Sequence, residues 1–116
     1  GGDAARVRAA VEAANRAGAE RESAETGLRL EAWTTRAELE AATAREAVGR
    51  TAVLQARESQ RIIRDRYEAG LAGVNDVLRA ANALLDAEML RIASIVDVMV
   101  ARAALARSVG RIPSGR

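Results

Sequence analysis

Apolar residues recur at alternating three- and four-residue steps over much of this 116-residue chain, the spacing that lines one face of a coiled-coil helix. The pattern is strongest in the second part of the chain, where we expect a seam interrupted only by Glu88. Further apolar positions widen this seam, so the helix is expected to have neighbours on more than one side. The expected seam is Val74, Leu78, Ala81, Leu85, Glu88, Ile92, Ile95 and Met99, widened by Val77, Leu84, Met89, Val96 and Val100.

The first part of the chain predicts a longer helix with a seam of smaller residues. Between Asp3 and Glu68 there is no proline, and strong helix formers dominate. Opposite charges recur four residues apart, as in Arg36/Glu40 and Arg61/Asp65, which stabilises a chain only if it is helical. Small seam residues bury little area, so the two helices are expected to need further partners. The expected seam is Ala37, Ala41, Ala44, Val48, Ala52 and Ile62, with Leu54 and Ile63 beside it.

A glycine cluster separates the two helical patterns. Gly70 suits the left-handed residue that ends a helix, Asn75 is expected to cap the next one, and Asp76 is favourable in its first turn. The sequence therefore predicts an all-α fold, a long antiparallel helical hairpin with unequal, coiled-coil-like arms. The expected parts are a long helix over 3–69, a tip turn over 70–75, a return helix over 76–109 and a tail over 110–116, with 1–2 left over from an engineered fragment.

The two arms differ in length, about 100 Å against about 50 Å at 1.5 Å per residue. The return helix is expected to cover residues 37–69, which leaves the segment before Arg36 without a partner in this chain. Residues 15–27 contain no large apolar side chain, so they form either part of the helix or a loop that would give a three-helix bundle. If they are helical, another chain is expected to cover the overhang, with Trp33 as a packing anchor there.

Composition excludes several classes of function. Cysteine and histidine are absent, so the chain offers no thiol nucleophile, disulfide, histidine-ligated metal site or Ser-His-Asp relay. Acidic pairs such as Glu22 and Glu25 share a helix face, but carboxylate metal sites in helical bundles normally add histidine. We therefore expect no enzyme activity, metal or cofactor. Because the 18 cations are interleaved with 16 acids and few aromatics, nucleic acid is not an expected partner, and no apolar run approaches the roughly 20 residues of a membrane span.

The stretch from Arg66 to Leu78 resembles part of the C-terminal helical hairpin of TolC-like outer-membrane efflux proteins. In that family a long helix ends in an R-Y-x-x-G element, and the return helix opens with D-V-L-x-A and continues through L-L-x-A-E. The resemblance extends over about residues 55–110 and closes on a small-residue stretch that ends at Gly110. The matching residues are Arg66, Tyr67 and Gly70, then Asp76, Val77, Leu78 and Ala80, then Leu84, Leu85, Ala87 and Glu88.

The resemblance implies a homotrimeric duct in the outer membrane of a Gram-negative cell, continued by an α-helical barrel in the periplasm. This chain would be a periplasmic part of that barrel. Its tip would meet a periplasmic adaptor protein and, through the adaptor, an inner-membrane efflux pump. Such a duct is passive and performs no chemistry. By itself, the chain is expected to self-associate along its apolar flanks and not to span a membrane.

The same resemblance assigns roles to the tip residues. Asp76 matches an acidic position that narrows the pore in some members, although a carboxylate at a helix start is equally explained by the helix dipole. Arg79 is the second candidate for the pore constriction; it stands where some members have another aspartate, and this exchange argues against cation selectivity. Arg66 and Tyr67 are expected to hold the tip packed. Adaptor docking is assigned to Gly70, which also serves as a helix cap, and to Leu71, Ala72 and Gly73.

Two other interpretations remain open at this point. The hairpin of a periplasmic adaptor also consists of two long antiparallel helices, but its arms are nearly equal and its tip carries an R-L-S-like motif. A generic coiled-coil scaffold would use its tip only for the turn. In that case, replacing Gly70 would change the stability of the protein but would not affect binding to any partner.

Overall fold

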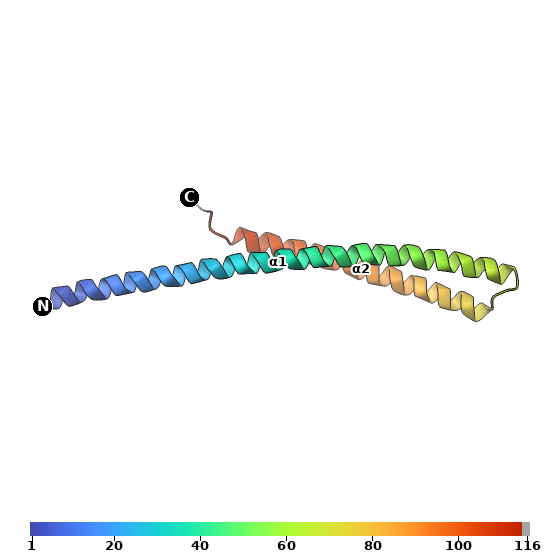
Figure 1. Cartoon of the computed structure of the whole chain (residues 1–116), viewed down its shortest axis with the longest axis horizontal. Helices are drawn as coiled ribbons and strands as arrows, with labels where there is room; N and C mark the ends of the chain where they lie inside the picture. Colours follow the sequence, from blue (N-terminus) through green and yellow to red (C-terminus); the bar gives the residue numbers. More distant parts are fainter. Residues whose placement is uncertain (115–116) are drawn as a thin grey trace.

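The computed structural model describes residues 1–114, which form two helices joined by the turn 69–73 (Figure 1). Helix α1 spans Gly2–Glu68, and helix α2 spans Val74–Gly110 and runs back antiparallel along the C-terminal part of α1. The described chain is a rod of 102 × 26 × 13 Å. The predicted all-α hairpin with unequal arms is therefore confirmed.

Helix α1 is continuous through residues 15–27, so the three-helix alternative is wrong. Gly18 and Gly27 each cost about 1 kcal/mol in a helix interior, but the alanines, arginines and glutamates around them favour the helix. Helix α2 reaches slightly farther along α1 than expected, because Ser108 and Arg111 both contact Glu31. The N-terminal segment 2–27, called the overhang below, has no helix beside it among the described residues (Figure 1).

Between the two helices lies an inner seam of mainly small and polar residues at heptad spacing. Alternating steps of three and four residues bring these positions onto one side of each helix. Val53 and Ala42 are the most buried, each only 1% exposed. The inner seam comprises Leu28, Ala32, Thr35, Leu39, Ala42, Glu46, Gly49, Val53, Ala56, Gln60 and Ile63 on α1, and Val77, Ala80, Leu84, Ala87, Arg91, Ser94, Val98, Ala101, Leu105 and Ser108 on α2.

Most positions of the expected seams do not pack between the helices, and for these the prediction is wrong. The exceptions are partly buried: Ala52, Ile63, Ala81 and Glu88. Ile92 and Met99 of α2 are 62% and 63% exposed, and Val48 of α1 is 70% exposed. We call Leu78, Leu85, Met89, Ile92, Val96 and Met99 the outer stripe of α2, and Ala37, Ala41, Ala44, Val48 and Ile62 the outer seam of α1; all are exposed. Of the positions expected to widen the α2 seam, Val77 and Leu84 are the ones that turn inward.

Close approach of the helices explains this choice of face. A Cβ atom added to Gly49 would lie only 3.6 Å from the Cα atom of Arg91 and 3.5 Å from the Oγ atom of Ser94. Leucine or methionine at such a position would hold the helix axes apart, whereas glycine, alanine and serine let the backbones come together. The inner seam is therefore selected by shape, even though the outer stripe has more apolar area to bury.

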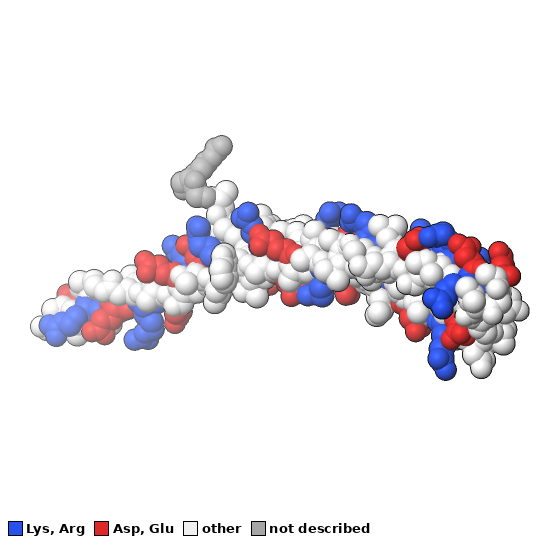
Figure 2. Space-filling model, turned by 45° about the vertical axis from the view of Figure 1, so that its right-hand side comes forward, with Lys and Arg blue, Asp and Glu red and all other residues white. Residues whose placement is uncertain are grey.

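On the face shown in Figure 2, charged residues of both signs are interspersed along the rod. The pairs Arg36–Glu40 and Arg61–Asp65 are formed as expected, and Glu46–Arg50 is a third pair four residues apart. Such exposed pairs contribute about 0.2–1 kcal/mol each. Across the helices, Arg57 lies 3.5 Å from Glu88, and Arg111 lies 3.1 Å from Glu31 near the end of α2. Within residues 1–114, neither helix contains a stretch long and apolar enough to cross a membrane.

Candidate functional site at the hairpin tip

Helix α1 ends in a hydrogen-bonded glycine turn. The backbone N–H of Leu71 donates to the carbonyl of Arg66 at 2.7 Å, and the N–H of Gly70 donates to the carbonyl of Tyr67 at 3.0 Å. Gly70 has φ of +76°, the left-handed conformation that glycine adopts without steric cost. The prediction that Gly70 ends the first helix is confirmed, and the turn is built from the R-Y-x-x-G residues themselves.

Helix α2 begins with a cap provided by an aspartate inside its first turn. Gly73 is extended at φ −92° and ψ 168°, and its backbone N–H donates to Oδ2 of Asp76 at 3.1 Å. Asn75 lies within the helix, so its expected role as the cap is wrong. Because Asp76 reaches back to Gly73, the glycine occupies the capping position and the carboxylate also meets the positive end of the helix dipole.

These two caps fix a blunt apolar end on the rod. Leu71 is 69% exposed, and Tyr67, Val74 and Leu78 near it are about half exposed. Charged residues of both signs surround this end of the hairpin (Figure 2). Since both helix ends satisfy their backbone groups locally, the exposed apolar side chains are not needed to close the turn and are free to contact another molecule.

The structure brings the assigned tip residues together. Gly70, Leu71, Ala72 and Gly73 form the turn, and Ala72 is the half-buried member. Asp76 and Arg79 follow on the exposed surface of α2, three residues apart and so on neighbouring positions of the helix. Arg66 and Tyr67 end α1, where their carbonyl groups accept the turn hydrogen bonds. A pore contact for Asp76 and Arg79, and packing of Arg66 and Tyr67 on a neighbouring helix, stay predictions.

Val74 and Leu78 were not assigned to the tip from the sequence. They were placed in the seam between the helices, but in the structure they extend the apolar surface of Leu71 along α2. The spacing is itself the signal: Val74 follows Leu71 by three residues and Leu78 follows Val74 by four, which continues one helix face into the turn. The apolar end of the hairpin is thus the start of the outer stripe.

Close to the tip, Arg61 lies between two carboxylates of α1. Its side chain donates to Glu58 through Nε at 3.0 Å and through Nη2 at 2.6 Å, and to Asp65 through Nη1 at 2.9 Å. The hydrogen bond from Arg61 lowers the pKa of Glu58 from its usual value, and the same bond raises the pKa of Arg61. This cluster is fully exposed and stiffens the last turns of α1 without forming a binding cavity.

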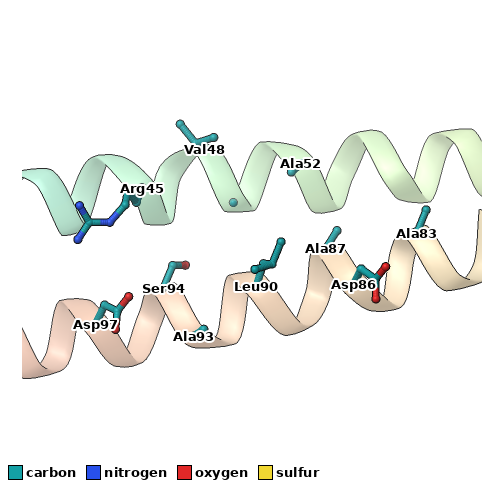
Figure 3. A pocket seen from close by; sticks show the side chains of 11 residues that line it. Arg45, Val48, Ala52, Ala83, Asp86, Ala87, Leu90, Ala93, Ser94 and Asp97 are labelled. Carbon is teal, nitrogen blue, oxygen red and sulfur yellow. The ribbon is translucent and has the colours of Figure 1, made fainter.

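A shallow groove of about 520 Å³ follows one side of the hairpin (Figure 3). Ala83, Ala87, Leu90 and Ser94 project from α2 toward α1, whereas Val48 projects from the opposite side of α1. Two carboxylates, Asp86 and Asp97, line the groove but are separated by about three helical turns. Carboxylates so far apart cannot act on one substrate atom, so the groove is a surface between helices and offers no catalytic arrangement.

Comparison with protein-family models, with curated proteins and with solved structures finds no match to this chain.

Proposed function

We propose that this chain is a periplasmic segment of the α-helical barrel of an outer-membrane efflux duct. In this proposal the duct is a homotrimer, and the tip docks on a periplasmic adaptor protein that connects it to an inner-membrane pump. The observation that carries the proposal is the tip: a 102 Å rod ends in a capped turn whose most exposed apolar residue is Leu71. The proposal rests on this geometry together with the resemblance of residues 55–110.

The sides of the rod support an assembly of several helices. Each helix presents apolar residues away from the other, in the outer stripe of α2 and the outer seam of α1. In the overhang, Ala4, Val7, Val11, Ala14 and Gly18 keep the phase of the inner seam, but Arg21 and Glu25 interrupt it before Leu28. Exposed apolar patches often mark surfaces that contact other proteins.

An adaptor hairpin is the weaker interpretation. Its arms are expected to be nearly equal, whereas α1 has 67 residues and α2 has 37. The tip sequence from Gly70 to Gly73 also lacks the R-L-S-like motif of such hairpins.

The proposal predicts that an adaptor hairpin binds the tip, and a pull-down with immobilised candidate adaptor hairpins tests this. We expect Leu71→Asp to abolish retention, because a charge replaces the most exposed apolar side chain of the tip. Leu30→Asp is the matched control: Leu30 has similar exposure, 61% against 69%, but lies far from the tip on α1. Gly70→Glu and Asp76→Ala alter the two caps and are expected to weaken retention.

Retention of wild type and Leu30→Asp, with loss for Leu71→Asp, would support the proposal. Equal retention of all variants, or retention of none, would contradict tip docking. A generic scaffold predicts that no variant is retained and that Gly70→Glu reduces the stability of the hairpin.

A further inference from the structure

Arg91 differs from the other arginines of the chain because it lies in the inner seam between the helices. It is the one arginine within residues 1–114 that is not exposed. Its Nε atom is buried, and no group in that part of the chain accepts a hydrogen bond from it. A buried guanidinium without a partner costs free energy, because it has lost water without gaining a hydrogen bond. The inner seam therefore contains a cation that the hairpin itself leaves unsatisfied.

The carboxylates of the inner seam and of the adjoining α2 surface are engaged elsewhere. Glu46 accepts two hydrogen bonds from Arg50 of its own helix, at 2.5 and 3.4 Å. Glu88 lies 3.5 Å from Nη2 of Arg57, which is longer than the roughly 2.7–2.9 Å of a charge-assisted hydrogen bond. Arg91 takes part in none of the ion pairs found within residues 1–114. Two arginines thus share one loosely held carboxylate.

Arg91 lines a groove of about 330 Å³ between the two helices, which we call the arginine groove. Two arginines and one glutamate contribute its charges, so its formal charge is +1. The rest of its lining is apolar: Val53 is 1% exposed, whereas Ile92 and Ile95 are 62% and 39% exposed. The groove therefore combines a cationic part with an apolar part. Its lining residues are Val53, Arg57, Glu88, Arg91, Ile92 and Ile95.

The groove shown in Figure 3 lies on another side of the hairpin and has the opposite charge. Leu90 of that groove and Ile92 of the arginine groove are about 200° apart around α2. A negatively charged ligand is therefore favoured in the arginine groove and disfavoured in the other. The charged residues of the groove in Figure 3 are Arg45, Asp86 and Asp97, which give it a formal charge of −1.

We propose that the arginine groove binds a single-chain carboxylate, a molecule with one carboxylate on a short alkyl chain. The carboxylate lies against the guanidinium groups of Arg91 and Arg57, because their planar N–H donors match the geometry of a carboxylate. The alkyl chain lies against Val53, Ile92 and Ile95, which the groove exposes to solvent only in part. Small-molecule sites span about 300–1,000 Å³, so a groove of this volume suits one short chain.

This site is separate from the hairpin tip. It goes beyond the proposed function and does not depend on it, because neither arginine of the groove belongs to the turn that is proposed to contact an adaptor. Loss of carboxylate binding would therefore leave the pull-down result unchanged, and loss of adaptor retention would leave the arginine groove intact.

Titration of the full chain with sodium decanoate, below the concentration at which it forms micelles, tests the site. The Nε–H signal of Arg91 and the backbone amide signals are followed by nuclear magnetic resonance. We expect the signals of Arg91, Arg57 and Ile95 to shift together, with a dissociation constant on the order of 0.1–1 mM for so open a groove. Acetate has the same carboxylate without the chain and should bind at least about tenfold more weakly, because it buries no apolar surface.

Three variants separate this site from general binding of an amphiphile. Arg91→Met keeps a long side chain without the charge and should weaken decanoate binding roughly tenfold or more. Arg57→Gln is at an exposed position and leaves the inner seam intact, so its expected loss of about threefold tests the site even if Arg91→Met alters packing. Arg45→Met is the matched control, because it removes an arginine from the groove of Figure 3 and should leave the affinity unchanged.

The expected order of affinity for decanoate is thus wild type and Arg45→Met, then Arg57→Gln, then Arg91→Met. Equal affinity of wild type, Arg57→Gln and Arg91→Met would overturn the proposal, because the two arginines would then take no part in binding. Equal affinity of wild type for acetate and decanoate would also overturn it, because the apolar part of the groove would then contribute nothing.

Discussion

The two apolar faces of α2 differ in the size of their side chains and in what covers them. The inner seam alternates alanine and serine with larger residues such as Leu84 and Val98, and it packs on α1. The outer stripe holds larger residues such as Leu85 and Ile92, and it is more than half exposed at both of them. The hairpin thus closes on the face that permits the closer approach and leaves outward the face with more apolar area.

This difference indicates that one face of α2 serves folding of the hairpin and the other serves association with other molecules. Gly49 lets the backbone of α1 approach Arg91 of α2 closely, and this approach helps to define the pairing of the two helices. Large residues left outside provide the hydrophobic free energy for contacts with other molecules. Substitutions at four positions test this packing, and they follow in order of decreasing expected effect.

The largest effect is expected from a charge in the inner seam. Val53 is 1% exposed, so Val53→Asp would bury an unpaired carboxylate and lower the free energy of unfolding by roughly 2–4 kcal/mol. Val48→Asp, on the exposed outer seam, should leave the unfolding of the dilute hairpin nearly unchanged. Urea unfolding followed by circular dichroism measures both. Equal destabilisation by the two variants would show that Val48 is as important as Val53 for packing the two helices together.

A larger side chain at the closest helix contact tests the role of approach distance. Gly49→Leu should separate the helices and cost about 1–3 kcal/mol, because the added atoms exceed the space beside Arg91 and Ser94. Gly49→Ala places its Cβ atom at ordinary contact distance and should stabilise the helix by up to about 1 kcal/mol. Thermal unfolding of the two variants should therefore shift in opposite directions. A stabilising leucine would contradict close packing at this point.

Replacing glycine with alanine should have opposite effects on stability in the turn and in the interior of α1. Gly70→Ala forces a side chain into φ of +76° and is expected to destabilise the hairpin by about 1 kcal/mol. Gly27→Ala, with open space around its Cα atom in α1, should instead stabilise by about 1 kcal/mol. Thermal melts of both proteins check this. Stabilisation by Gly70→Ala would mean that the chain does not reverse there through a left-handed glycine.

The smallest effect concerns the exposed surface. The pKa of Glu58 is lowered by its hydrogen bond with Arg61, so this interaction stabilises the helix above the unfolded pKa near 4.3 and is lost as pH falls through the folded value. Unfolding midpoints measured from pH 5 to pH 3 should fall slightly less for Glu58→Gln than for wild type. Identical acid dependence of the two would show that the bond does not form in solution.

The sequence predicts the parts of this fold that depend on local preference. Proline-free, alanine-rich helices and the glycine that ends the first one follow from propensity and turn chemistry, and Gly70 and both helices lie where they were expected. The N-cap of the second helix was not predicted correctly. Asn75 is a residue type that often caps helices, but in the structure Asp76 accepts a hydrogen bond from the backbone N–H of Gly73, which is the capping residue.

The choice between two apolar faces could not be read from the sequence. Hydrophobic periodicity identifies the face with the most apolar residues, here that of Leu78, Leu85 and Ile92. The face that packs also depends on how closely the backbones can approach, as at Gly49. On α2 the predicted seam is therefore shifted by one residue from the seam that packs, for example at Leu85 in place of Leu84. That failure also left Val74 and Leu78 out of the predicted tip, to which Leu71 was assigned.

The reversal at the tip is tested most directly by one distance in solution. Spin labels at Arg36→Cys and Arg102→Cys, in protein diluted with unlabelled chain, report the separation of α1 and α2 by pulsed electron paramagnetic resonance. Packed helices with axes about 8–10 Å apart predict a label separation of roughly 20 Å or less. An uninterrupted helix would place the same residues about 100 Å apart, and a loss of the short distance would contradict the hairpin.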